Sequence, residues 1–208
     1  MSATLKLGFL ASRNGSSFRA ILDAIDAGGL SAQARLIVSN NRKSGALGFA
    51  HERGVPSLCI PTERDPVAAD LALRDALDAA GVDLVVLSGY LRNLGPATLA
   101  RYHNRVVNIH PGLLPEFGGE GMYGRRVHEA VIAAGARTSG ATIHLVDAEY
   151  DRGPVLARRE LTLAPGETVD SLEARVTALE PLFFVETLQA IAAGDLKLPQ
   201  YPISDNIP

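Results

Sequence analysis

Hydrophobic and polar positions follow two alternating patterns through the first half of the chain. Short, nearly continuous apolar runs predict buried strands at residues 4–12, 34–39, 56–61, 83–88 and 106–110. Longer amphipathic stretches lie between these runs and predict helices at residues 18–27, 44–53 and 67–80. Strands that alternate with helices in this way are typical of a mostly parallel sheet with helices on both faces.

The order of elements changes after the glycine-rich residues 116–124. The pattern there predicts a helix at 125–134, strands at 139–146 and 155–157, and a helix that opens at 168–173. Asp170 is the predicted N-cap of that last helix, and its apolar stripe consists of Leu172, Val176, Leu179, Phe183 and Leu188. We therefore expect an α/β fold: a doubly wound, mostly parallel, Rossmann-like sheet flanked by helices, with antiparallel strands toward the C-terminal part.

Length and composition narrow the class of protein. The 208 residues suit a single domain (1–208), in which we distinguish an N-terminal part, about 1–105, from a C-terminal part, about 106–208. A hydrophobic content of 47% with 21% charged residues is typical of a globular protein with a sizeable core. The formal charge of −3 argues against general nucleic-acid binding, and no run approaches the roughly 18 apolar residues of a membrane span. A single cysteine and no recognisable signal peptide fit a cytoplasmic protein.

The strand at 106–110 carries the first candidate site. Asn108 and His110 are two residues apart, so both side chains point to the same face where Pro111 ends the strand. Ligands of open α/β sheets bind at this end of the strands. An amide and an imidazole can both donate hydrogen bonds to a developing oxyanion. The alternative is a core histidine beside an ordinary turn.

A second candidate site lies in the first turn, where a strand meets a helix at Asn14, Gly15, Ser16 and Ser17. The start of a helix offers unpaired N–H groups and a partial positive charge, and a glycine lets the backbone approach an anion closely. The turn lacks the lysine of a phosphate-binding loop and the spaced glycines of a dinucleotide fingerprint. An ordinary turn between strand and helix is the alternative.

Further candidates have simpler structural alternatives. Asp151 lies in an acidic turn, where it would orient His110 and raise its pKa if the two were close. Glu180 precedes Pro181, which we expect to kink the last helix and leave that carboxylate beside the core. His144 shares a strand face with Thr142 and Val146 and either lines a pocket or fills the core. Residues 116–124 contain four glycines and predict either a mobile lid or a simple surface loop.

Three of these motifs together resemble the folate-dependent formyltransferase family. They are Asn108-Ile-His110-Pro-x-Leu-Leu-Pro after a strand, Asp151-x-Gly-Pro downstream, and Asn14-Gly-Ser-Ser in the first turn. The resemblance covers essentially the whole chain. It implies N10-formyltetrahydrofolate as the formyl donor and the amine of glycinamide ribonucleotide as the acceptor. It implies small-molecule partners only, no metal, no nucleic acid and no membrane, and a monomer or homodimer.

The resemblance also implies a role for each candidate. Asn108 and His110 would bind the formyl oxygen, and Asp151 would keep His110 protonated and carry the proton from the attacking amine. The N-terminal part would bind the nucleotide, with the phosphate on residues 14–17, and the ribonucleotide would also contact Glu180 and His128. The C-terminal part would hold the catalytic and folate sites, and the folate cleft would be formed by Leu91, Arg92, Leu94, Val146, Asp147 and Ala148.

The sequence departs from the familiar form of the family in the first turn and in the glycine-rich segment 118–124, which is several residues longer than the commonest form. Arg13 and Ser17 replace a glycine and an asparagine, so the individual phosphate contacts stay open. The same Asn–His–Asp set would also serve a formyltetrahydrofolate hydrolase or a formyltransferase that acts on an amino-sugar nucleotide. From another class, a non-catalytic nucleotide-binding module would contain the same first turn.

Overall fold

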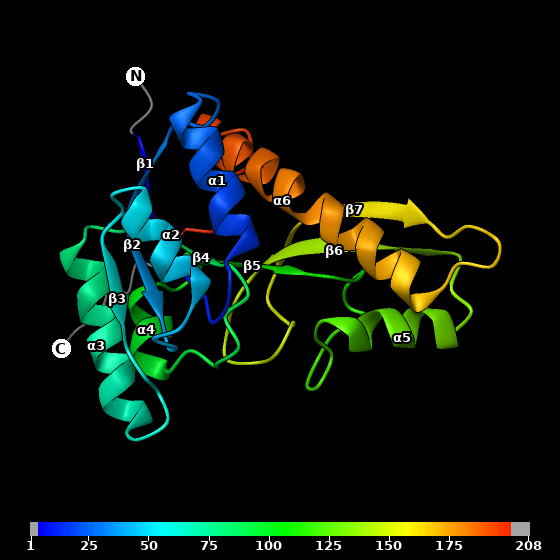
Figure 1. The fold of residues 1–208 in the computed structure, drawn as a ribbon, viewed down its shortest axis with the longest axis horizontal. Helices are drawn as coiled ribbons and strands as arrows, with labels where there is room; N and C mark the ends of the chain where they lie inside the picture. The colour runs from blue at the N-terminus through cyan, green and yellow to red at the C-terminus, as the bar shows by residue number, and fades with distance from the viewer. Residues whose placement is uncertain (1–3, 201–208) are drawn as a thin grey trace.

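The computed structural model describes residues 4–200, which form a seven-stranded sheet and six α-helices (Figure 1). The strands are β1 (Leu5–Leu10), β2 (Ala32–Ser39), β3 (Ser57–Cys59), β4 (Leu84–Leu87), β5 (Val106–His110), β6 (Thr138–Leu145) and β7 (Val155–Thr162). The helices are α1 (Ser16–Asp26), α2 (Gly45–Glu52), α3 (Pro66–Ala79), α4 (Pro96–Arg101), α5 (Arg125–Ala133) and α6 (Val169–Ala193).

The sheet has the strand order β3-β2-β1-β4-β5-β6-β7. Strands β1 to β5 pair in parallel, and the two pairings β5–β6 and β6–β7 are antiparallel. The fold class predicted from the sequence is therefore confirmed. The strand order reverses between β1 and β4, which is the switch point where doubly wound sheets bind ligands.

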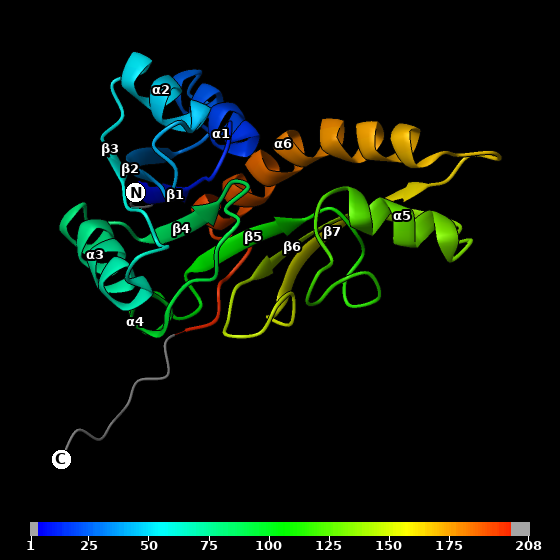
Figure 2. The same cartoon turned by 60° about the horizontal axis from the view of Figure 1, so that its bottom comes forward.

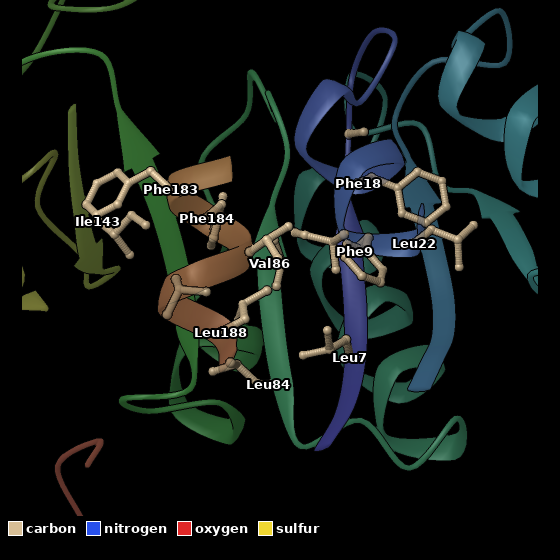
Figure 3. Close-up of a cluster of buried hydrophobic side chains, with 14 of the residues drawn as sticks. Leu7, Phe9, Phe18, Leu22, Leu84, Val86, Ile143, Phe183, Phe184 and Leu188 are labelled. Carbon is tan, nitrogen blue, oxygen red and sulfur yellow. The ribbon is translucent and has the colours of Figure 1, made fainter. Parts of the chain in front are cut away.

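Two apolar layers cover the sheet, one on each face. Helices α1, α2 and α6 pack on one face, whereas α3 and α4 pack on the other (Figure 2). Figure 3 shows how the first layer joins distant parts of the chain, because Phe9 of β1, Val86 of β4 and Phe184 of α6 lie in one cluster. None of these three residues has any exposed surface. The N-terminal and C-terminal parts of the chain therefore share a core.

Helix α6 is long and apolar enough, by length and composition, to cross a membrane. Core helices of globular proteins have the same composition. In this structure Leu172, Val176, Phe184 and Leu188 of α6 are fully buried against the sheet and its neighbouring helices. The helix therefore serves as a core element here, and Pro181 lies within it.

One local expectation was wrong, and one short helix was not predicted. The N-cap of α6 is Thr168, whose side chain accepts the Ser171 N–H, whereas the Asp170 carboxylate forms an ion pair with Arg125 at 2.6 Å. Helix α4 was not predicted, because six residues are too few to give a clear helical period. The α3 residue Asp70 accepts hydrogen bonds from backbone N–H groups in the first turn of α4, so a tertiary contact stabilises this short helix.

Candidate active site

The structure brings the predicted trio Asn108, His110 and Asp151 together at the carboxyl end of β5. His110 Nδ1 lies 3.4 Å from Asp151 Oδ2. Asp151 belongs to the loop between β6 and β7 and has a left-handed backbone with φ of 55°. The loop turns back at Gly153, where a Cβ atom would lie only 1.9 Å from the Leu145 carbonyl oxygen. The glycine of the Asp-x-Gly-Pro motif is therefore required for the close approach that positions the carboxylate.

His110 is almost fully buried, with 3% of its surface exposed. Its Nε2 donates a hydrogen bond to the Phe117 carbonyl at 2.6 Å, which places a proton on that nitrogen. Burial lowers the pKa of His110, and the opposing effects of Asp151 and the Phe117 carbonyl do not restore it. Asp151 acts on the pKa of His110 in the expected upward direction, but the loss of hydration outweighs the carboxylate, so the net shift is downward.

The backbone of the glycine-rich segment contacts both members of this pair. Besides the bond from His110 to Phe117, the Gly119 N–H donates to Asp151 Oδ2 at 3.0 Å. Between them, Gly118 packs so closely that a Cβ atom would lie 2.2 Å from a Leu114 methyl group and 3.0 Å from Asp151 Cβ. Gly118 thus lets the backbone of this segment pack directly against Asp151.

Sequence reasoning did not assign His144 to the site, yet the structure places it at the centre. His144 lies on β6 directly opposite Asn108, and the Asn108 Nδ2 to His144 Nε2 distance is 3.2 Å. The same Nε2 lies 3.5 Å from Asp151 Oδ1. The signal in the sequence was the shared face of His144, Thr142 and Val146, but only the antiparallel register shows that Asn108 is its neighbour.

A cleft of about 280 Å³ opens beside these residues. Asn108, His144 and Asp151 line it, and so do the predicted folate residues Arg92, Leu94, Val146, Asp147 and Ala148. Leu91 does not line it; its side chain is 51% exposed and borders a neighbouring hollow with Arg13 and Arg42. Tyr90 lines the cleft without having been predicted, and burial raises its pKa to about 12.

The first turn forms a tight connection between β1 and α1. Gly15 has φ of 63° and precedes Ser16, the first residue of α1. A Cβ at Gly15 would lie 3.0 Å from the Ala46 side chain, so the turn also packs closely against α2. Asn14 and Ser16 are exposed, whereas Ser17 is buried. The neighbouring Phe18 N–H donates to Ser88 Oγ of the β4–α4 loop, which fixes the first turn beside the switch point.

Glu180 and His128 lie on helices α6 and α5. Burial raises the pKa of Glu180 from 4.5 to about 7. His128 is 2% exposed, its Nδ1 has no hydrogen-bond partner among residues 4–200, and burial lowers its pKa. Within the same residues, neither side chain forms a hydrogen bond or ion pair with the trio. No group of three or more His, Cys, Asp or Glu in this part of the chain could hold a metal ion.

A carboxylate, two imidazoles and an amide beside a cleft, all at the carboxyl edge of a doubly wound sheet, define a ligand-binding α/β protein with an acid–base site. Over residues 5–188 the chain matches the family described as formyl transferase, and it belongs to that family. The family predicted from the sequence is confirmed.

Three of the similar proteins share one name. A phosphoribosylglycinamide formyltransferase of Mycobacterium tuberculosis strain H37Rv is 37% identical over 92% of this chain and 86% of its own length. A chloroplastic phosphoribosylglycinamide formyltransferase of Vigna unguiculata is 39% identical over 89% of this chain, which spans 60% of that longer protein. The solved structure of the Coxiella burnetii phosphoribosylglycinamide formyltransferase has a TM-score of 0.85 at 34% identity, covering 94% of this chain and 90% of that one.

A formyltetrahydrofolate deformylase from Pseudomonas syringae shares the same fold, with a TM-score of 0.84 at 20% identity. The fold alone therefore does not distinguish transfer of a formyl group from its hydrolysis.

Proposed function

We propose that the chain transfers a formyl group from N10-formyltetrahydrofolate to the amine of glycinamide ribonucleotide, a step of purine synthesis. The observation that carries this proposal is the Asp151–His110 pair, 3.4 Å apart, beside an amide that lines a cleft. The names of the relatives support the choice of substrates. We further propose that the protein works in the cytoplasm as a monomer or homodimer.

In the proposed mechanism the neutral amine attacks the formyl carbon directly, and a tetrahedral intermediate forms without an enzyme-bound formyl group. Asn108 donates an N–H to the oxygen that becomes negative. The loss of one such donor typically costs about 2.7–4 kcal/mol, or roughly 100- to 1,000-fold in rate. His110 adds a second donor from Nε2 when the Phe117 carbonyl, which accepts that proton in the present structure, moves aside.

Asp151 serves as the proton acceptor in this mechanism. The two His110 nitrogens face two acceptors, the Phe117 carbonyl and the Asp151 carboxylate, so a neutral ring turns a lone pair toward Asp151. The His110–Asp151 pair can take one additional proton, that of the attacking amine, and this proton removes the repulsion between the lone pair and the carboxylate. The pair then passes the same proton, through water, to the leaving folate nitrogen.

The substrates occupy separate surfaces in this proposal. The folate lies in the cleft, where Leu94 and Val146 provide apolar walls and Arg92 and Asp147 provide polar groups. The ribonucleotide phosphate binds the backbone and hydroxyls of residues 14–17, and Glu180 and His128 contact the rest of the ribonucleotide. Binding of the remote phosphate helps to hold the amine near the formyl carbon.

The test is the release of tetrahydrofolate from 10-formyltetrahydrofolate with and without glycinamide ribonucleotide. Release that requires the ribonucleotide supports the proposal. Release at an equal rate without it would indicate a hydrolase, and requirement for an amino-sugar nucleotide would indicate another acceptor. A nucleotide-binding module would show no turnover, and its ligand binding would be unaffected by His110→Ala.

A further inference from the structure

The neighbourhood of Asn108 shows how its amide is oriented. A planar amide can present either its NH₂ group or its oxygen to the cleft, and only the NH₂ group stabilises an oxyanion. The orientation is decided by the protein group that contacts the amide. In this structure that group is the His144 ring, with Nε2 at 3.2 Å from Asn108 Nδ2.

The protonation of the His144 ring follows from its other nitrogen. His144 Nδ1 lies 2.9 Å from the Leu145 carbonyl oxygen, which can only accept a hydrogen bond. Nδ1 therefore carries the proton, and in the neutral ring Nε2 carries a lone pair. That lone pair accepts an N–H from Asn108 and would repel the amide oxygen. Burial, the largest influence, lowers the pKa of His144, which favours this neutral form.

Backbone features keep the ring in place. Asn108 and His144 are direct partners in the antiparallel β5–β6 register. On its other side, β6 pairs with β7 through a bulge, since Ile143 pairs with Ala157 and His144 with Val155, which leaves Leu156 as the extra residue. Bulges often turn a side chain toward a site. Gly153 packs against the same Leu145 carbonyl that accepts from His144 Nδ1, so the turn and the ring support each other.

We propose that His144 is a positioning residue: its Nε2 accepts one N–H of Asn108 and thereby directs the second N–H toward the formyl oxygen. This inference rests on the proposed function. The same Nε2 lies 3.5 Å from Asp151 Oδ1, so a proton there would shift the ring toward the carboxylate and release Asn108. His144 thus assists only in its neutral form.

Two substitutions distinguish a role of His144 as a hydrogen-bond acceptor from a role in packing alone. His144→Gln places an uncharged acceptor near the position of Nε2, whereas His144→Phe fills the space without one. We expect kcat to fall roughly 10- to 100-fold in His144→Phe, a part of the loss for the donor itself, with KM for both substrates within about two-fold. His144→Gln should recover most of that loss. His51→Phe, at an exposed histidine of α2, is the control and should leave kcat unchanged. Equal losses in the Gln and Phe variants would overturn the proposal.

A double-mutant cycle gives the sharper test. If His144 acts through the Asn108 amide, His144→Phe should change kcat little in an Asn108→Ala background. Equal fold-losses in both backgrounds would show that His144 acts independently of Asn108 and would overturn the proposal.

A spectroscopic test of the His144 ring does not depend on turnover. Long-range ¹H–¹⁵N correlation spectra at pH 7.5 should show His144 with a proton on Nδ1 and none on Nε2, with the signals assigned by their loss in His144→Gln. A proton on Nε2 would overturn the proposal even in an active enzyme. The spectra and the activity assay can also disagree. If the ring state is as expected but the protein does not use glycinamide ribonucleotide, the proposed function is wrong, whereas the ring state required for the Asn108–His144 contact is present.

Discussion

At the scale of single residues, the chemistry of the site depends on where one proton resides. His110 and His144 are both buried, and burial lowers the pKa of each. The carboxylate of Asp151 lies within 3.5 Å of both rings and raises the pKa of each, which partly offsets the effect of burial. Removal of that charge should therefore disturb proton transfer more than substrate binding.

We expect Asp151→Asn to lower kcat by about 100-fold or more, because proton transfer by a positioned group contributes about 10²–10⁴-fold. The asparagine keeps the size of the side chain, so KM for both substrates should change little. Steady-state kinetics with each substrate varied in turn measures both quantities. Near-normal turnover would remove Asp151 from the mechanism.

Glu180 makes stability depend on pH. Its pKa is raised from 4.5 to about 7, so the folded protein holds a proton that the unfolded chain has lost between these values. The contribution of Glu180 to the free energy of unfolding is thus fully present below pH 4.5 and is lost as the pH rises through about 7. At about 1.4 kcal/mol for each pH unit, the loss amounts to about 3 kcal/mol.

We accordingly expect Glu180→Gln to gain stability relative to the unmodified protein as the pH rises from 4.5 to 8. Urea unfolding at several pH values measures the free energy of unfolding of both proteins. Glu186→Gln on the same helix, where the carboxylate pairs with Arg159, is the control. A constant difference between Glu180→Gln and the unmodified protein over this range would contradict the expectation.

At the scale of elements, the proposed phosphate site is the turn at Asn14 and Gly15 together with the start of α1, where the hydroxyls of Ser16 and Ser17 can be removed together. We expect Ser16→Ala with Ser17→Ala to raise KM for the ribonucleotide roughly 10-fold or more, since a hydrogen bond to a charged group is worth about 1.5–3 kcal/mol. KM for the folate substrate serves as the internal control. Equal effects on both constants would contradict the phosphate assignment.

Elements with a clear period were predictable, and so were side chains whose direction follows from their own strand. Asn108 and His110 are examples, because two residues along a strand always share a face. His144 required the antiparallel register of β5 and β6, which no local pattern encodes. The contacts of Phe117 and Gly119 with His110 and Asp151 likewise depend on how the glycine-rich segment folds back. Local patterns thus predict elements, whereas contacts between elements complete the site.

At the scale of the whole molecule, one core joins the two parts of the chain that were distinguished at about residue 105. Phe184 of α6 packs in the same cluster as Phe9 of β1 and Ile143 of β6 (Figure 3). Loss of contacts at its centre should therefore weaken both parts together rather than release one of them.

We expect Phe184→Ala to lower the free energy of unfolding by about 3–5 kcal/mol. Unfolding should remain a single transition, with far-ultraviolet circular dichroism and the fluorescence of a probe on Cys59 changing at the same urea concentration. Leu182→Ala, at a 60% exposed position of the same helix, is the control. Separate midpoints for the two signals would indicate two independent folding units.

The hydrogen bond from His110 to the Phe117 carbonyl has a consequence for the design of inhibitors. A compound that offers its own acceptor to His110 must first displace one that the protein already supplies, so the exchange yields little affinity. Asn108 gives one N–H to His144, so an acceptor aimed from the cleft at its second N–H meets no such internal competitor within the described chain. Medicinal chemistry on this scaffold should therefore begin from the amide.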